Sequence, residues 1–279
     1  MAGTLYVVAT PIGNLEDFTF RGRRVLSEVD VIACEDTRHA RVLLSHYGIT
    51  TPVVSYHERN ERTRAAGLVA RLRRGEDVAL ISDAGTPALS DPGFPLIREA
   101  IDAGILVVPV PGPSAALAAL AVAGLPVDRV LFLGFLPRRS GERIRALEMV
   151  RTGPWTLILY EAPHRITALL QDLQRVLGDR RIALARELTK RYEEIFRGTI
   201  VDAMVHLRAH PPRGEFTVVV EGAGGASPVA TNPEDARGTM RDLLSAGRSP
   251  QEAVAEVMRT SGLPRREAYR LLLEVRGKR

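Results

Sequence analysis

The sequence has a single cysteine, Cys34, and only two lysines, Lys190 and Lys278, among 279 residues. One cysteine excludes an internal disulfide and is typical of proteins in the reducing cytoplasm. Because Cys34 stands in an apolar run, we expect a buried small side chain there rather than a nucleophile. No apolar run approaches the roughly 20 residues of a membrane-spanning helix, and residues 1–6 show no basic signal-peptide segment. We therefore expect a cytoplasmic protein without a membrane partner.

The common nucleotide and metal motifs are missing as well. The sequence contains no GxGxxG, no GxxxxGK[ST] and no HExxH, so dinucleotide-binding, P-loop and zinc-protease functions lose their direct support. The six histidines have no paired metal-ligand spacing, and with one cysteine a zinc site is not expected. The acidic, glycine-rich first loop of the common Rossmann-like methyltransferases is also absent. We expect no metal.

Positive charge is present, and arginine carries nearly all of it. The net charge is +5, with 38 Lys and Arg against 33 Asp and Glu. Arginine binds phosphate through two parallel hydrogen bonds and stacks on bases, so this composition is compatible with an RNA partner. GC-rich coding, which favours arginine over lysine, is an equally good explanation of the bias.

Three loops of similar composition each follow an apolar run. The run at residues 78–82 leads into Asp83 and a Gly- and Pro-rich loop that extends to Gly93. Residues 10–17 follow the run 5–9, and residues 111–115 follow the run 105–110. Short buried strands that end in such loops are typical of parallel sheets, whose carboxyl edge binds ligands. For any one loop the alternative is a structural connection, and Ser114 could simply cap the helix expected after it.

Charged residues directly after other expected strands are the second candidate group. Such groups are costly beside a buried strand unless they are paired or used. For Asp36 or Thr37 the alternative is a helix N-cap, and for any charged residue it is a salt bridge across a cleft between domains. The candidates for the chemistry are Glu35, Asp36, Arg38, Glu161, His164, Glu187 and Lys190.

The order of apolar runs and helical patterns predicts an α/β fold. We expect an N-terminal α/β domain over residues 1–125 and a second α/β domain with a mixed sheet over 126–222. Residues 223–232 have linker composition, and residues 233–279 predict a small module of three helices. This module has ten basic and seven acidic residues, and Arg265, Arg266, Arg270 and Arg276 lie on or before its last helix. It could dock RNA, or present a solvated face or a dimer contact.

Eight motifs, taken in this order, resemble the tetrapyrrole methylase superfamily. They are YVVATPIGNLED at 6–17, ACEDTR at 33–38, SDAGTPALSDPG at 82–93, VPGPSA at 110–115, GFLP at 134–137, LYEAPHR at 159–165, RELTK at 186–190 and GEFT at 214–217. The resemblance implies two α/β domains with S-adenosylmethionine as the cofactor in the cleft between them. It also implies a homodimer. Within the superfamily the motifs match the branch that 2′-O-methylates the ribose of a cytidine in 16S (small-subunit) ribosomal RNA, as free RNA or in the 30S subunit. The cofactor-binding positions that it implies are Thr10, Pro11, Gly13, Asp83, Gly85, Thr86, Ala88, Ser114, Ala115, Tyr160, Ala185 and Glu215.

The chemistry of that reaction sets what the site must contain. Methyl transfer from a sulfonium is an in-line displacement, so positioning the hydroxyl supplies much of the rate. A ribose hydroxyl is a weak nucleophile, so a base is expected, and the sequence leaves open which candidate acts as one. Arg38, Arg165 and Arg186 could bind phosphates. Two other functions stay open: methylation of a tetrapyrrole at carbon, and RNA binding without catalysis.

Overall fold

The computed structural model describes residues 2–224, 233–261, 263 and 265–277. The chain divides into two compact units, residues 1–222 and residues 223–279. Most of the expected linker, residues 225–232, lies outside the described residues, as do Lys278 and Arg279. Nor are the side chains of Arg259 and Arg265 described. Within the described residues, no helix is long and apolar enough to cross a membrane.

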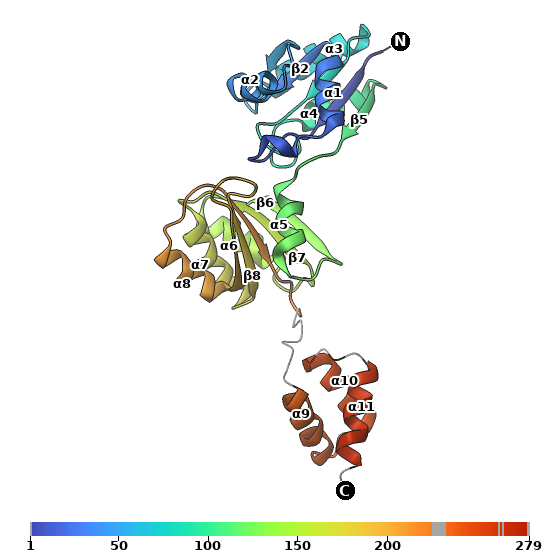
Figure 1. Cartoon of the computed structure of the whole chain (residues 1–279), viewed down its shortest axis with the longest axis vertical. Coiled ribbons are helices and arrows are strands. Elements are labelled where there is room, and N and C mark those ends of the chain that lie inside the picture. The colour runs from blue at the N-terminus through green and yellow to red at the C-terminus, as the bar shows by residue number, and fades with distance from the viewer. Residues whose placement is uncertain (1, 225–232, 262, 264, 278–279) are drawn as a thin grey trace. The chain divides into compact units, whose positions relative to one another are not determined.

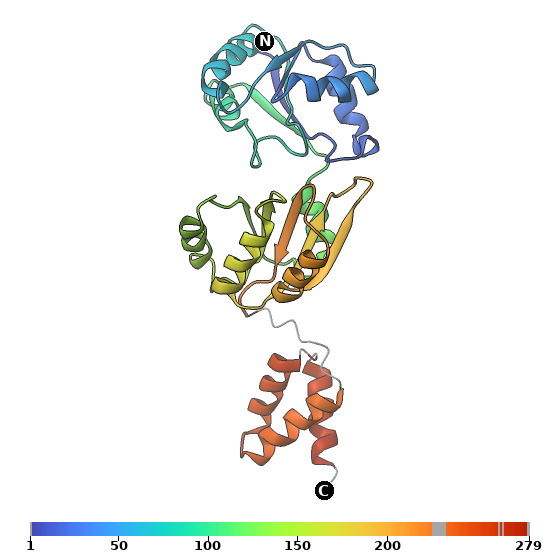
Figure 2. The same cartoon turned by 90° about the vertical axis from the view of Figure 1, so that its left-hand side faces the viewer.

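The first sheet is parallel throughout and has the strand order β3-β2-β4-β1-β5. Helices cover both of its faces, with α1 and α2 over one core cluster and α3 and α4 over the other (Figures 1 and 2). Its strands are buried on both faces, which explains why they appear in the sequence as short continuous apolar runs. The elements are β1 (Thr4–Val8), the 3-10 turn η1 (Leu15–Asp17), α1 (Phe20–Glu28), β2 (Val31–Cys34), α2 (Thr37–His46), β3 (Val53–Ser55), α3 (Glu61–Arg73), β4 (Val78–Leu80), α4 (Phe94–Asp102) and β5 (Leu106–Val110).

The second sheet is mixed and has the order β6-β7-β10-β8-β9. Strands β6 and β7 are parallel, and the other pairs are antiparallel. The two α/β sheets with helices confirm the fold class expected from the sequence. The elements are α5 (Ala115–Ala123), β6 (Val130–Phe135), α6 (Ser140–Glu148), β7 (Thr156–Glu161), α7 (Ile166–Leu177), β8 (Arg181–Arg186), β9 (Glu194–Thr199), α8 (Ile200–Ala209) and β10 (Phe216–Val220).

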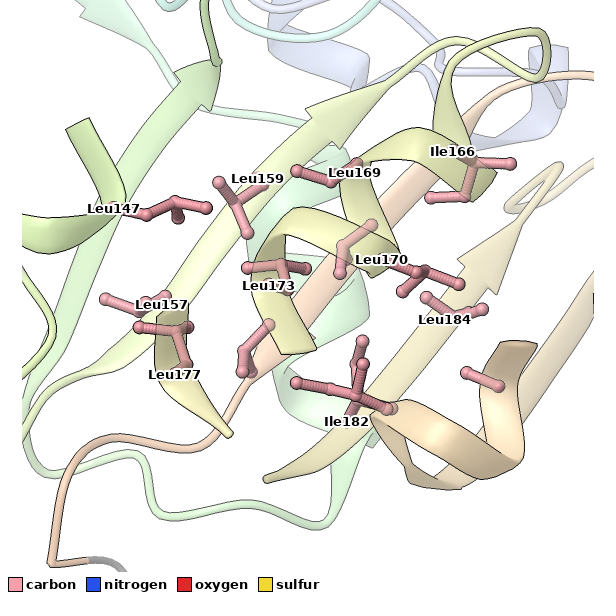
Figure 3. Close-up of a cluster of buried hydrophobic side chains, with 14 of the residues drawn as sticks. Leu147, Leu157, Leu159, Ile166, Leu169, Leu170, Leu173, Leu177, Ile182 and Leu184 are labelled. Carbon is pink, nitrogen blue, oxygen red and sulfur yellow. The ribbon is translucent and has the colours of Figure 1, made fainter. Parts of the chain in front are cut away.

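A leucine-rich core lies between this sheet and helices α6, α7 and α8. Figure 3 shows Leu169, Leu170 and Leu173 of α7 directed toward side chains of the sheet, among them Leu159 and Leu184. Their spacing of three and four residues places them on one face of the helix. Burial of a leucine side chain stabilises the fold by about 1.5–3 kcal/mol, so this face holds α7 on the sheet.

The opposite face of the second sheet is covered by α5, a helix of small residues. Ala116, Ala119 and Ala123 pack against Ala183 and Val219 of the sheet. Their short side chains let the helix lie close to the strands. The domain division at residue 125 stays a prediction, and this packing favours counting α5 with the second sheet.

The C-terminal unit contains three helices, α9 (Pro233–Ser245), α10 (Pro250–Ser261) and α11 (Arg265–Arg276). The three helices pack against one another (Figure 1). They enclose a small core that includes Met240, Val257 and Leu272. At the start of α10, the Glu252 backbone N–H donates to Ser249 Oγ at 3.3 Å, and the Ser249 N–H donates to Glu252 Oε2 at 2.9 Å. This reciprocal pair is a capping box, which the sequence indicates at this position.

Candidate active site

Hydrogen bonds tie the loops after β1 and β4 together. Thr10 N–H donates to the Gly85 carbonyl at 2.8 Å, and Gly85 N–H donates to the Thr10 carbonyl at 3.1 Å. The Thr10 hydroxyl also donates to the Ser82 carbonyl at 3.1 Å. Because β1 and β4 are neighbours in a parallel sheet, their carboxyl ends meet at one edge. The prediction that these loops share a sheet edge therefore agrees with the structure.

The side chain of Asp83 links the loop after β4 to the loop after β2. Its Oδ1 accepts from the Asp36 backbone N–H at 3.0 Å, and its Oδ2 lies 3.9 Å from His39 Nδ1. Thr86 makes the corresponding link to the loop after β5, donating from Oγ1 to the Pro113 carbonyl at 3.4 Å. All four loops thus form one connected edge.

A cavity of about 550 Å³ opens where these loops face one edge of the second sheet. That edge consists of the ends of β6, β7 and β8 and the start of β10, because Phe216 is paired with both Glu161 and Arg186. The volume lies within the usual range for small-molecule sites. The expected cofactor positions that line the cavity are Asp83, Gly85, Thr86, Ser114, Ala115, Tyr160, Ala185 and Glu215.

The remaining cofactor positions lie elsewhere. Thr10, Pro11 and Gly13 line an adjoining cavity of about 320 Å³, which shares Asp83, Lys190 and Glu215 with the first. Ala88 lines neither cavity and is one of the few non-glycine residues with a left-handed backbone, at φ 67°. Whether any of these residues binds the cofactor stays a prediction.

Aromatic side chains form one wall of the larger cavity. The rings of Tyr160 and Phe135 lie 5.6 Å apart, and that of Phe132 lies 5.2 Å from Tyr160. Phe216 also lines the cavity, and burial raises the pKa of the Tyr160 phenol. Of these residues only Tyr160 is among the cofactor positions that the resemblance implies, although Phe135 and Phe216 stand in the motifs at 134–137 and 214–217. Their place beside Tyr160 depends on strand pairing, which no local pattern specifies.

The N-terminus of α5 faces the cavity through Ser114 and Ala115. Ser114 occupies the N-cap position with an extended backbone, but its hydroxyl makes no capping hydrogen bond. The first backbone N–H groups of a helix lack partners within the helix and carry a partial positive charge. In that first turn the Ala116 N–H bonds the Tyr160 phenol, so Ser114 leaves its hydroxyl and the other N–H groups of the turn for a polar or anionic group.

Lys190 joins Glu187 and Glu215 at the boundary of the two cavities. Its Nζ donates to Glu187 Oε1 at 2.9 Å and to Glu215 Oε2 at 3.0 Å. Burial alone would lower the pKa of Lys190, but the two carboxylates outweigh it and raise the pKa. Burial likewise opposes ionisation of Glu187, yet its bonds from Lys190 and the Glu215 N–H lower its pKa. Both groups are therefore held in their charged forms, so neither is suited to accept a proton in this arrangement.

Gly13 allows the loop after β1 to approach this cluster. A Cβ at Gly13 would lie 2.4 Å from Lys190 Cγ and 3.0 Å from the Leu188 carbonyl oxygen. The first distance is far below a normal contact and the second is tight, so a residue with a Cβ would require Lys190 or the loops to shift. The position is constrained by packing, which is a sufficient reason for glycine whether or not the cofactor touches it.

Glu161 and His164 line the cavity in different ways. The Glu161 side chain is fully buried, accepts from the Ala162 N–H at 2.9 Å and lies 3.2 Å from Arg165 Nη2. Arg165 also donates to the Leu136 carbonyl at 2.9 Å, so its guanidinium is already engaged inside the fold. His164 is exposed at the cavity, where its ring can reach a substrate.

Glu35, Asp36 and Arg38 do not line either cavity. Asp36 is the N-cap of α2, accepting from the Arg38 N–H at 2.8 Å, and its Oδ2 also accepts from Arg38 Nη2 at 2.7 Å. The side-chain hydrogen bond from Arg38 lowers the pKa of Asp36 well below its usual range. The capping alternative for Asp36 is thus realised. Burial, with the nearby Asp83 charge, raises the pKa of Glu35.

Arg186, the third arginine considered for phosphate binding, is paired within the second sheet. Its Nη1 lies 3.2 Å from Glu194 Oε2, while Glu194 Oε1 lies 2.7 Å from His206 Nε2. In the part of the chain that the structure describes, no three His, Cys, Asp or Glu side chains are grouped so that they could hold a metal ion.

Comparison with known proteins identifies the family. A model of the family described as Tetrapyrrole (Corrin/Porphyrin) Methylases matches residues 4–203. The chain is 45% identical, over 276 residues, to a Halalkalibacterium halodurans protein named Ribosomal RNA small subunit methyltransferase I, covering 96% of this chain and 94% of the relative. A Pseudomonas aeruginosa protein of the same name is 47% identical over 281 residues, covering 99% of each.

Solved structures agree on the fold. A uroporphyrin-III-C-methyltransferase of Thermus thermophilus matches with a TM-score of 0.53 and 24% identity, covering 78% of this chain and 94% of that one. At that identity the likeness concerns the fold alone. With the family's model matching most of the sequence, and with relatives similar over nearly their full length, the chain belongs to the tetrapyrrole (corrin/porphyrin) methylase family.

Proposed function

We propose that this chain transfers a methyl group from S-adenosylmethionine to the 2′-hydroxyl of a cytidine ribose in small-subunit ribosomal RNA. The observation that carries the proposal is the cavity of about 550 Å³ between the loop edge of the first sheet and an edge of the second, in a member of a methylase family. The relatives from Halalkalibacterium halodurans and Pseudomonas aeruginosa are named for the RNA of the small subunit, which supports RNA as the substrate. That the methyl acceptor is the 2′-oxygen of a cytidine is implied by the motif resemblance.

The residues of the cavity fit S-adenosylmethionine. Its carboxylate suits the start of α5 with the free Ser114 hydroxyl, because helix N-termini attract anions. Its adenine suits the aromatic and apolar wall of Tyr160, Phe135 and Leu188. When bound, S-adenosylmethionine would supply a methyl group on a positively charged sulfur, and carboxylates that line the cavity would stabilise that charge.

The chain's own residues then orient the nucleophile and exclude water. The bonds of Asp83, Thr86 and Lys190 fix the loops before any ligand arrives, so little ordering remains to be done on binding. His164, exposed in the loop after β7, stands where a ribose can enter from solvent, while Glu161 at the end of β7 is buried in the cavity wall. Holding the hydroxyl in line with the methyl is the main contribution that such a site makes to the rate.

We also propose that the C-terminal unit contributes to RNA binding. On α11, Arg266, Tyr269, Arg270 and Leu273 are exposed and lie on one face of the helix, while Ala268 and Leu272 on the other face are buried. Guanidinium groups bind phosphates, and an exposed tyrosine can stack on an unpaired base. We further propose that the protein is cytoplasmic and forms a homodimer, in which the catalytic cavity is present twice.

The test of the activity is transfer of labelled methyl from S-adenosylmethionine to purified 30S subunits. We expect one 2′-O-methyl group per subunit, located by a stop in primer extension at low nucleotide concentration. Free ribosomal RNA and a precorrin serve as the alternative acceptors. Transfer to the precorrin alone would contradict the proposal, and binding of subunits without transfer to any acceptor would favour a non-catalytic RNA-binding protein.

The test of the α11 surface is the double substitution Arg266→Gln with Arg270→Gln in the full chain. Loss of two phosphate contacts should lower the slope of log affinity against log salt by about one per contact, with S-adenosylmethionine affinity unchanged. The control carries the same charge change at Arg241 and Arg248, which are also exposed in this unit. If both double substitutions had the same effect, the arginines of α11 would act only through the net charge of the unit.

A further inference from the structure

Asp91 is a cavity-lining carboxylate that is not among the candidate residues expected from the sequence. It lies in the loop after β4 and lines the large cavity together with Tyr160 from the second sheet. The preceding residue, Ser90, has a left-handed backbone at φ 68°. Ser90 also packs on Gly134 of β6, because a Cβ on Gly134 would lie only 2.5 Å from the Ser90 Oγ. The loop is therefore held in an unusual conformation against β6, with Asp91 at the cavity.

The other carboxylates of this cavity already have partners. Glu161 lies against Arg165, Glu187 and Glu215 share Lys190, and Asp83 accepts from the Asp36 N–H. Among the described residues, Asp91 forms no ion pair, and its one hydrogen-bond donor is the Ser82 hydroxyl. That hydroxyl also lies 3.3 Å from the Ala84 and Gly85 carbonyl oxygens, to which it can donate instead. Asp91 is thus the carboxylate most available to a ligand.

The surroundings of Asp91 increase its affinity for a proton. Burial, followed by the negative charges of Glu35 and Asp83, raises the pKa of Asp91 to about 6. The groups that face it are Glu35 after β2, Asp83 and Ser82 after β4, and the Tyr160 phenol on β7. At neutral pH Asp91 is still mostly ionised, yet it binds a proton more strongly than an exposed carboxylate does. A general base works best when its pKa lies near the operating pH.

We propose that Asp91 accepts the proton of the ribose hydroxyl during methyl transfer. The inference rests on the proposed function and adds the residue that the sequence could not choose. As the new bond forms between the ribose oxygen and the methyl carbon, the bond between that carbon and the sulfonium sulfur breaks, and its electron pair stays on sulfur. The hydroxyl proton moves to a carboxylate oxygen of Asp91 and is then released to water.

The experiment compares Asp91→Asn with the parent protein in single-turnover transfer to 30S subunits. The variant should lose about 10²- to 10⁴-fold in rate, which is the usual contribution of a general base. S-adenosylmethionine affinity by calorimetry and subunit affinity should stay unchanged. Below about pH 6 the parent's rate should fall as Asp91 becomes protonated, and this fall should be absent from the residual rate of the variant. The matched control is Asp102→Asn, at the exposed end of α4, where the side chain lies 3.8 Å from Arg98.

Thermal unfolding gives a readout that does not depend on activity. Folding raises the pKa of Asp91 above its unfolded value of about 3.9, so ionisation of Asp91 destabilises the fold. This destabilisation is complete at a pH above the folded pKa and absent at a pH below the unfolded pKa. Asp91→Asn should therefore melt higher than the parent at about pH 7.5, with the gap closing by about pH 3.5. Asp102→Asn should show no such pattern.

Two outcomes would overturn the proposal. One is retention of the full transfer rate by Asp91→Asn, and loss of transfer in His164→Ala would then assign the base to His164. The other is loss of S-adenosylmethionine binding in Asp91→Asn, which would make Asp91 a cofactor contact. Failure of the parent protein to methylate subunits would instead refute the proposed function, so the two failures are distinguishable.

Discussion

Replacing Arg143 by methionine tests how the second sheet holds the loop that leads away from Phe135. The Arg143 side chain is only 4% exposed, and its Nη2 and Nε reach Asp172 Oδ2 at 2.5 and 2.7 Å. Its Nη1 lies 3.2 Å from the Arg138 carbonyl oxygen and 3.4 Å from that of Pro137. One guanidinium therefore joins α6 to α7 and also fixes the loop between β6 and α6.

The size of the effect follows from what the substitution leaves behind. Asp172, with a side chain 11% exposed, would keep only the Ser140 hydroxyl, at 3.1 Å from its oxygens. Breaking a buried ion pair by removing one partner costs about 3–5 kcal/mol. Because Asp172 keeps the Ser140 hydroxyl and is partly reached by water, we expect the lower end, about 3 kcal/mol. For a unit of this size that corresponds to a fall of about 6–12 °C in the unfolding midpoint.

The only tryptophan provides a local assay. Trp155 directly precedes β7, so its fluorescence during urea unfolding reports on the same sheet that Arg143 stabilises. The control is Arg139→Met, because that side chain is 86% exposed and lies 3.6 Å from Glu142. A surface pair of this kind contributes less than about 1 kcal/mol. Combining Arg143→Met with Asp172→Leu should recover most of the loss, since both charges are then removed. A loss below about 1 kcal/mol for Arg143→Met alone would refute the argument.

Three further substitutions test the loops of the candidate site. Asp83→Ala removes the acceptor of the Asp36 N–H, and we expect S-adenosylmethionine affinity in calorimetry to fall about tenfold, or about 1.4 kcal/mol; an unchanged affinity would place the cofactor elsewhere. Gly85 has φ 79°, so Gly85→Val should cost about 1–2 kcal/mol of stability and weaken the same binding, and a neutral result in both would contradict the assigned strain. Lys190→Met removes a donor that lowers the pKa of Glu187. The lowered pKa stabilises the fold above about pH 4.3, and this stabilisation is lost on acidification, so the variant should lose less stability than the parent between about pH 7 and pH 3. An equal loss in both proteins would show that the pair has no such role.

The first sheet could be predicted from the sequence because its strands are buried on both faces. Continuous apolar runs that end in Gly- and Pro-rich loops indicate parallel strands, and the carboxyl ends of parallel strands meet at one edge of the sheet. Asp83, Thr86 and Ser114 could therefore be placed on one edge from the sequence alone. The start of α3 was predicted less well. The charged, arginine-rich pattern of residues 57–74 predicts a helix from residue 57, but the Asn60 side chain accepts from the His57 N–H at 2.8 Å, so a turn comes first and the helix begins at Glu61.

The assignment of charged residues could not be made from the sequence. Asp36 and Glu161 both follow buried strands, and the same pattern fits a cap, an ion pair or a catalytic group. The structure separates them, because Asp36 caps α2 while Glu161 lies buried against Arg165. Asp91 was passed over for the opposite reason. Its loop contains two prolines and two glycines that explain its shape, and only burial beside Glu35 and Asp83 distinguishes its side chain from other loop aspartates.

Backbone strain is concentrated where the cavity is. Among the described residues, the non-glycine positions with positive φ are Ala88, Ser90, Glu187 and Thr189, and they belong to the two loops that face each other from the first and second sheets. A left-handed conformation costs a non-glycine residue about 1–2 kcal/mol, so it persists only where other bonds over-determine the loop. The Thr10–Gly85 pair and the Lys190 cluster supply such bonds. Because such bonds favour one shape of both loops before any ligand arrives, part of the energetic cost of ordering the site is met by folding rather than by binding.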